Sequence, residues 1–315
     1  MKRIVDDERM MLLVCDLYYN QSLGQKEIAK KLNLSRPTVS RLLINAREKG
    51  VVKIILADLS RRAHIELEQK LQKKYSLRDI IITDSHEDKE ALHEELGYAG
   101  ALFLERILKN NDIVGVSMGT TIPHIIPHIT ADYFQGLTFV PMIGGVGVAA
   151  TELHSNYLAD SFAKAFHGTA LAFHAPAMVS RIQAKHELLQ EESIAGIISM
   201  AGRFDVALSG IGAPNEDSTI IKTGYFSHEM LEDFVKNDIC GDICLQFFDT
   251  RGNLSRYEHN QRVVGVDIET LRGIPWSIGI AGGVKKASAI RGALSGRYIN
   301  ALITDEECAR RLLDG

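Results

Sequence analysis

Short apolar segments alternate with amphipathic helical segments over residues 79–315, and this alternation constrains the fold of the chain most strongly. The strand candidates are residues 79–83, 113–117, 138–143, 169–173, 206–209, 263–266, 277–281 and 301–303. Helical segments are predicted in many of the gaps, at residues 88–108, 151–166, 186–201, 228–236, 286–294 and 306–313. Apolar strands that alternate with helices predict a mostly parallel sheet that is covered on both faces. In such sheets, ligands bind beyond the carboxyl ends of the strands.

Residues 24–50 have a different pattern, which predicts two short amphipathic helices joined by a tight turn. In the second helix, apolar residues recur at the spacing of one buried face, at Val39, Leu42, Leu43 and Ala46. Ser35 is a good N-cap for this helix, and Pro37 is tolerated because the first turn has no internal partner for its missing N–H. The segment is typical of a helix-turn-helix whose recognition helix covers residues 36–49.

The other face of this second helix is rich in groups that donate hydrogen bonds to phosphates and base edges. Residues 1–58 carry a net charge of +4 in a chain whose net charge is −4, so the remainder carries −8. Any helical hairpin with a solvated basic face would have a similar sequence pattern. A basic N-terminal segment on an otherwise acidic chain nevertheless favours contact with a polyanion. We therefore expect five residues to contact double-stranded operator DNA: Ser35, Arg36, Thr38, Ser40 and Arg41.

A chain of 315 residues with 45% hydrophobic residues has room for a small and a large domain. We expect a DNA-binding domain at 1–58, a linker helix at 59–78 and an effector-binding and oligomerisation domain at 79–315. The β-branched run at 51–56 predicts a strand that closes the small domain. The sequence has neither an apolar stretch of about 18 residues nor a signal-peptide core, and its four cysteines lack CxxC spacing. These features favour a cytoplasmic protein with reduced thiols and no membrane contact.

The first of three glycine-bearing turns follows the strand candidate at 113–117. Gly119 precedes two hydroxyl side chains, Thr120 and Thr121, at the start of a helix that its prolines make short or kinked. The backbone amides and hydroxyls of such a turn can hold a phosphate. Taken alone, the motif is better explained by Thr120 serving only as an N-cap.

The second turn carries adjacent glycines, Gly144 and Gly145, which allow a ligand to approach the backbone closely. The segment lacks a complete GxGxxG pattern and a nearby acidic residue, so a dinucleotide site is not expected. Asn156 follows it, either as a polar contact to a ligand hydroxyl or as a helix-surface residue.

The third turn has Gly282 and Gly283 after a strand, with Lys286 on the first turn of the next helix. This arrangement is typical of an anion cradle with a cation at its rim. Each turn alone is a weak signal. Three glycine-bearing turns at the same end of one sheet, two of them with anion-binding chemistry, together indicate a small phosphorylated ligand.

Two further features of the sequence have open interpretations. Asp242 can accept a hydrogen bond from a sugar hydroxyl or can simply close a turn, and the two readings are equally good. His124 and His128 have the i, i+4 spacing of a metal site on a helix, but Pro127 between them spoils the helical register. We therefore expect no metal site and no other cofactor, and no arrangement of His, Cys and Asp suggests nucleophilic catalysis.

The chain resembles the SorC family of bacterial sugar-responsive transcription regulators over nearly its whole length, and it is most similar to the deoxyribonucleoside-regulator branch of Bacillus. The resemblance rests on LSRPTVSRLL at 34–43, VSMGTT at 116–121, GG at 144–145, GDICLQFFDTRGN at 241–253 and AGGVKKASAIRGALSGRYINALITDEECA at 281–309. It implies an α/β fold with an N-terminal helix-turn-helix and a large Rossmann-like domain similar to sugar-phosphate isomerases and deaminases. That large domain would be a sensor, and the resemblance also implies a homo-tetramer.

In the family, a phosphorylated sugar binds the large domain and alters operator affinity. Together, the motifs and the resemblance predict ten effector-binding residues: Gly119, Thr120, Thr121, Gly144, Gly145, Asn156, Asp242, Gly282, Gly283 and Lys286. Relatives that sense deoxyribose phosphate have a lysine just before the double glycine, which forms a Schiff base with the aldehyde. This chain has Ile143 there, so the resemblance implies a different sugar phosphate or a phosphorylated polyol.

Two rival functions remain open at this point. One is a sugar-phosphate isomerase or deaminase with an appended DNA-binding head, although residues 205–212 lack the carboxylate-rich DGADE-type segment of the isomerases. The other is a DNA-binding scaffold whose large domain only oligomerises. The preferred reading is a transcriptional regulator, acting as a repressor of a carbohydrate operon, without enzymatic activity.

Overall fold

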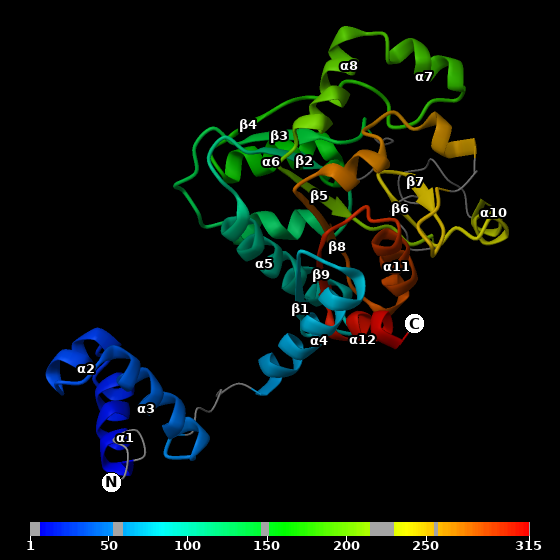
Figure 1. The fold of residues 1–315 in the computed structure, drawn as a ribbon. Coiled ribbons are helices and arrows are strands. Elements are labelled where there is room, and N and C mark those ends of the chain that lie inside the picture. Colours follow the sequence, from blue (N-terminus) through cyan, green and yellow to red (C-terminus); the bar gives the residue numbers. More distant parts are fainter. Residues whose placement is uncertain (1–6, 53–58, 146–150, 215–229, 255–257, 315) are drawn as a thin grey trace. The chain divides into compact units, whose positions relative to one another are not determined.

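The computed structural model describes residues 7–52, 59–145, 151–214, 230–254 and 258–314 (Figure 1). The chain divides into two compact units, Met1–Arg62 and Ala63–Gly315. Among the described helices, none combines the length and the hydropathy that crossing a bilayer requires.

The small unit consists of α1 (Glu8–Cys15), which continues as a π-helical turn (Asp16–Asn20), α2 (Gln25–Lys31) and α3 (Arg36–Glu48). The helices predicted in residues 24–50 are therefore present. The predicted apolar stripe of α3 is buried, at Val39, Leu42, Leu43 and Ala46. It packs in one core against Met11 and Val14 of α1 and Ile28 of α2. Residues 53–56 of the strand predicted at 51–56 lie outside the described residues.

The large unit is a mixed α/β fold around a parallel sheet of seven strands. The order across the sheet is β1-β9-β8-β5-β2-β3-β4, and every paired neighbour is parallel. The strands are β1 (Asp79–Thr83), β2 (Ile113–Val116), β3 (Thr138–Pro141), β4 (Thr169–Ala170), β5 (Val206–Gly210), β8 (Trp276–Ile280) and β9 (Ala301–Asp305). The alternation of apolar strands and helices thus correctly predicted a parallel sheet.

Helices cover both faces of this sheet because the strands are apolar on both sides. In β9, Ala301 and Ile303 join the core under α5 (Lys89–Ile107) and α6 (Ser155–Ala165), whereas Leu302 joins the opposite core. That opposite core also contains buried residues of α4 (Leu59–Tyr75), α11 (Ala287–Ser295) and α12 (Glu306–Asp314). The segment predicted as one helix at 186–201 is instead α7 (Ile182–Leu188) and α8 (Glu192–Ser199). Near the hairpin described next lies α10 (Met230–Lys236), drawn in yellow in Figure 1.

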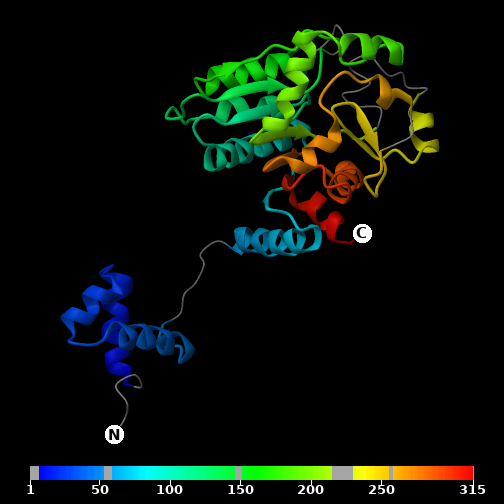
Figure 2. The ribbon, with the colours of Figure 1, turned by 45° about the horizontal axis from the view of Figure 1, so that its top comes forward.

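Two strand predictions need correction. Residues 263–266 do not form a strand of the main sheet, and only isolated bridges join Val263 to Met178 and Gly265 to Ile143. An unpredicted antiparallel hairpin is formed by β6 (Gly241–Ile243) and β7 (Gln246–Phe248). Gly and Asp are poor strand formers, which is why β6 gave no strand signal. The hairpin lies beside α11 in both views (Figures 1 and 2).

The strand order creates a switch point between β2 and β5. From β2 the chain proceeds outward through β3 to β4, and it then returns to the other side of β2 to form β5, β8 and β9. Connections on the two sides therefore leave in opposite directions, which opens a crevice beyond the carboxyl ends of β2 and β5. This crevice is where a ligand site is expected in an open α/β sheet.

Candidate functional site

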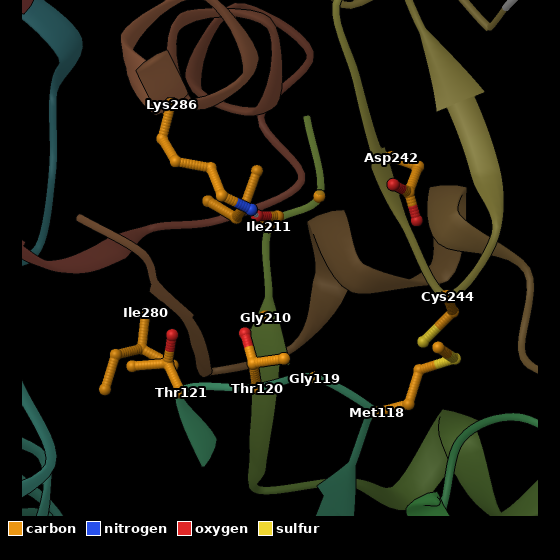
Figure 3. Close-up of a pocket in the computed structure, with 11 residues that line it drawn as sticks. Met118, Gly119, Thr120, Thr121, Gly210, Ile211, Asp242, Cys244, Ile280 and Lys286 are labelled. Carbon is orange, nitrogen blue, oxygen red and sulfur yellow. Dashed lines mark hydrogen bonds between the residues drawn. The ribbon is translucent and has the colours of Figure 1, made fainter. Parts of the chain in front are cut away.

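A pocket lies at this switch point (Figure 3). Its lining comes from the turns after β2 and β5, the end of β8, the β6–β7 hairpin and the short 3₁₀ helix η8 (Val284–Lys286). The lining residues are Met118, Gly119, Thr120, Thr121, Gly210, Ile211, Gly212, Asp242, Cys244, Ile280 and Lys286. Five of the ten residues predicted to bind an effector are therefore brought together, from segments separated by more than a hundred residues in the sequence.

The turn after β2 supplies hydroxyl groups to the pocket. Thr121 is buried and Thr120 is partly exposed, and Figure 3 shows both hydroxyls directed toward the side of the pocket where Lys286 lies. The turn is tied to the neighbouring strand by Ser117, whose hydroxyl oxygen accepts a hydrogen bond from the Gly210 amide at 3.0 Å. As predicted from its prolines, the helix that follows is short, the 3₁₀ helix η3 (Ile122–His128).

A buried carboxyl group and a lysine amine lie in the same pocket. Asp242 is only 6% exposed, and burial raises its pKa to about 6 against the opposing effect of the Lys286 charge. Burial lowers the pKa of Lys286, and the charge of Asp242 counteracts that change. The Lys286 amine donates to the Ile211 carbonyl oxygen at 2.6 Å, which holds it against the turn after β5. The pocket thus contains one potential cation and one potential anion at its two sides.

The hairpin is held to the end of β5 by a backbone bridge between Gly212 and Asp242. The Gly212 amide donates to the Asp242 carbonyl at 2.9 Å, and the Asp242 amide donates to the Gly212 carbonyl at 3.1 Å. A Cβ at position 212 would lie 1.8 Å from the Asp242 carboxylate, so only glycine fits. The Leu245 amide donates to Asp242 Oδ2 at 3.2 Å and fixes the orientation of the carboxyl group.

The other lining residues were not among the ten predicted effector-binding residues. The turn at Gly210–Gly212 follows a strand and carries two glycines, which marked it in the sequence as a further candidate, but it was not assigned to the effector. Cys244 had no such signal, because its position depends on the unpredicted hairpin. Burial raises the pKa of the Cys244 thiol, which keeps it protonated and unreactive at neutral pH.

Gly144 and Gly145 do not line the pocket. The Gly145 amide donates to the Ala175 carbonyl at 2.8 Å, and the Gly145 carbonyl accepts from the Ala177 amide at 2.7 Å. A Cβ on Gly144 would lie 2.4 Å from the Ala175 carbonyl oxygen. The close approach that these glycines permit is therefore made by the protein's own backbone.

Gly282 and Gly283 also lie outside the lining, and they shape the turn that carries Lys286. Gly283 has a φ of +90°, a conformation that favours glycine, and its amide donates to the Asp305 carboxylate. Its carbonyl accepts from the Lys286 amide at 2.8 Å. These glycines position the lysine backbone at the edge of the pocket.

Asn156 is engaged with the backbone of Phe173. Its amide group donates to the Phe173 carbonyl at 3.1 Å, and its carbonyl oxygen accepts from the Phe173 amide at 2.7 Å. The paired contacts fix the chain beyond β4. We expect Asn156→Ala to lower the free energy of unfolding by about 1–3 kcal/mol, because two backbone groups lose their partner. Effector affinity should stay within about twofold of wild type when both quantities are measured on the same preparation. Normal stability with weak effector binding would contradict this structural role.

The residues predicted to contact DNA lie at the start of α3. Ser35 caps the helix, and its hydroxyl accepts from the Thr38 amide at 3.2 Å and lies 2.8 Å from the Thr38 hydroxyl. Arg36 and Arg41 are exposed, and Ser40 is partly exposed. These side chains lie outside the buried stripe of α3.

Comparison with known proteins gives matches over nearly the whole chain. Residues 61–314 match the model of a sugar-binding domain family. The deoxyribonucleoside regulator of Bacillus subtilis is 34% identical over 313 residues, which cover 98% of this chain and 99% of that protein. The sorbitol operon regulator of Klebsiella pneumoniae is 32% identical over 315 residues, or 98% of each chain. The crystal structure of the full-length sorbitol operon regulator SorC from Klebsiella pneumoniae is similar at 33% identity and a TM-score of 0.76, and covers 98% of this chain and 99% of that one.

Proposed function

This chain belongs to the SorC family of transcriptional regulators with a sugar-binding domain, and we propose that a phosphorylated sugar or polyol controls its binding to operator DNA. The names of the relatives support the regulatory half of this proposal. The effector part of the proposal rests on the pocket at the switch point, which is lined by two hydroxyl groups, an amine and a carboxyl group.

We assign the phosphate to the side of the pocket that holds Thr120, Thr121 and Lys286. Threonine hydroxyls donate to phosphate oxygens, and a lysine amine adds a charge-assisted hydrogen bond. The amine is held at the Ile211 carbonyl, which keeps it at the edge of the pocket. A bound dianion would favour the charged ammonium and would oppose the pKa lowering caused by burial.

We assign the hydroxyl groups of the sugar or polyol to the side that holds Asp242. A carboxyl group that is fixed by the Leu245 amide still has acceptor capacity for a ligand hydroxyl. Among the described lining residues, Asp242 is the one with a carboxyl group. The similar proteins are named as regulators, which supports a sensor rather than an isomerase or deaminase.

For the small unit, we propose that α2 and α3 form the helix-turn-helix and that α3 enters the major groove of operator DNA. The exposed arginines at the start of α3 and the positive charge of residues 1–58 support this assignment. The remainder of the chain, from α4 onward, would bind the effector and assemble the protein, with a tetramer as the expected form.

Arg41→Ala should weaken operator binding by about tenfold, because an exposed arginine on the recognition helix loses its contact to a phosphate or base edge. Operator affinity is measured by titration at two fixed salt concentrations, and effector affinity is measured on the same variants. Arg251→Ala, which removes an exposed arginine of the large unit, is the matched control and should bind the operator normally. Equal losses of operator affinity in the two variants would contradict a specific contact between Arg41 and the DNA.

The effector must bind the DNA-competent and DNA-incompetent states of the protein with different affinities. A ligand that binds both states equally well does not change their populations. The test is thermal unfolding against a panel of sugar and polyol phosphates, each beside its unphosphorylated parent. A native-state ligand present at 100 times its Kd stabilises the protein by about 2.7 kcal/mol. We expect one phosphate to raise the unfolding temperature and its parent to have no effect.

The same phosphate should then change the affinity of the protein for its operator. Absence of any shift across the panel would contradict phosphate sensing and would favour a large unit that only assembles. Turnover of the phosphate by the protein would favour the isomerase or deaminase alternative.

A further inference from the structure

The middle of α5 is packed closely against the 3₁₀ helix η3. A Cβ on Gly97 would lie 2.2 Å from the His124 carbonyl oxygen, and a Cβ on Gly100 would lie 2.9 Å from the Ile125 side chain. Gly97 therefore lets the backbone of α5 approach the backbone of η3 to a distance that a residue with a Cβ would not permit. This close contact brings polar side chains of the two elements together.

Three of these side chains carry metal-ligating atoms. Glu90 and His93 belong to α5 and His124 belongs to η3, and one ligand atom from each lies within 4.8 Å of the other two. His124 Nδ1 lies 3.9 Å from Glu90 Oε1, and the ring centroids of His93 and His124 are 5.2 Å apart. The histidines are partly buried and the glutamate is exposed, so the group opens to solvent on one side.

A fourth residue, Glu94, connects this group to His128. Its Oε2 lies 3.5 Å from His124 Nδ1, and its Oε1 lies 2.8 Å from His128 Nε2. Glu94 Oε2 faces the same ring nitrogen of His124 as Glu90 Oε1 does, so the Glu94 carboxylate lies beside the group as a further oxygen donor. Its other oxygen lies next to His128, outside the group of three.

We propose that Glu90, His93 and His124 bind one divalent transition-metal ion of the zinc class. Two imidazoles and a carboxylate form a ligand set that Zn²⁺ accepts, with water in the fourth position. Ligand atoms in such a site are about 3.3 Å apart when each is about 2.0 Å from the ion, so the group must contract slightly. Glu90 can supply this contraction because its side chain is 79% exposed and free to rotate.

The expectation of no metal site rested on His124 and His128 as a pair on one helix. The structure shows a different partnership, in which His124 faces α5 across a contact between two elements. The His124 amide also donates to the Thr121 carbonyl at 3.2 Å. A bound ion would therefore brace the turn that carries Thr121 into the pocket.

The test uses the untagged full-length protein after treatment with a chelator. Zn²⁺ binding is measured by calorimetry, and Co²⁺ binding by its visible absorption, which reports coordination geometry. We expect one equivalent of metal to bind, and we expect His93→Gln and Glu90→Gln each to weaken binding by at least about tenfold. His186→Gln is the matched control, because His186 is an exposed histidine on α7 outside the group.

Unfolding temperatures measured in chelator show whether the variants still fold. Glu90→Gln is the decisive variant, because the Glu90 side chain is 79% exposed and glutamine keeps its size while it removes the charge. Absence of metal binding to the wild-type protein, or equal affinity in wild type and Glu90→Gln, would overturn the proposal. Loss of binding in His186→Gln would do so as well, because it would place the ion elsewhere.

Discussion

Lys286→Met is expected to weaken binding of the phosphorylated effector by about 100-fold and to leave operator binding without effector unchanged. The amine is the pocket's cation, and a hydrogen bond to a charged group contributes about 1.5–3 kcal/mol. Methionine keeps the length and apolar character of the side chain, so the substitution removes mainly the amine. Calorimetry with the effector identified in the phosphate panel measures the loss directly.

Lys285→Met is the matched control for this experiment. Lys285 is the preceding residue and carries the same charge, but it is exposed and does not line the pocket. We expect its effector affinity to stay within about twofold of wild type, since surface substitutions away from a site have small effects. Equal losses in both variants would indicate a general electrostatic effect and would contradict a specific contact by Lys286.

Asp242→Asn is expected to remove a pH dependence of stability of about 3 kcal/mol. Burial raises the pKa of Asp242 from 3.8 to about 6, so the folded protein binds this proton more tightly than the unfolded chain does. Below pH 3.8 the group is protonated in both states and has no effect. As the pH rises toward 6, the unfolded chain ionises first, and stability is lost progressively. Above pH 6 the full cost of the buried charge is present.

The measurement is urea unfolding of wild type and Asp242→Asn between pH 3.5 and pH 8, with the difference between the two curves as the readout. Asparagine can still accept the hydrogen bond from the Leu245 amide, so the variant keeps the local geometry. The difference should grow in favour of the variant from about pH 4 to about pH 6 and then stay level. Asp132→Asn, at an exposed carboxylate, should show no such trend. A flat difference for Asp242→Asn would contradict the raised pKa.

The sequence predicted most of the secondary structure of the sheet because buried parallel strands are apolar runs with clear boundaries. Asp79–Thr83 was predicted with its observed bounds, and the turns after β2 and β8 were correctly identified as glycine-bearing junctions. The apolar stripe of α3 was predicted for the same reason, since helical spacing of apolar residues reports burial directly.

The pocket was predicted only in part because a glycine after a strand does not reveal what approaches it. At Gly144 the approaching group is the backbone of Ala175, whereas at Gly212 it is the carboxyl group of Asp242. Both positions have the same local signature, and only the fold distinguishes them. The hairpin that carries Asp242 and Cys244 gave no signal of its own, because three-residue strands have too little periodicity to detect.

The attachment of the β6–β7 hairpin has a consequence for engineering ligand preference. The hairpin has its own two-stranded ladder, and the Gly212–Asp242 bridge joins it to the end of β5. Among the described residues, no strand of the seven-stranded sheet pairs with the hairpin strands. The phosphate side of the proposed site, in contrast, is carried by the turn after β2 and by η8. The proposed contacts to the anion and to the sugar hydroxyls thus come from different segments of the chain, although the hairpin side chains Ile243, Phe247 and Phe248 are buried in the main core. Exchange of the hairpin between relatives should therefore change which sugar or polyol the protein binds, while the proposed contacts to the phosphate are retained.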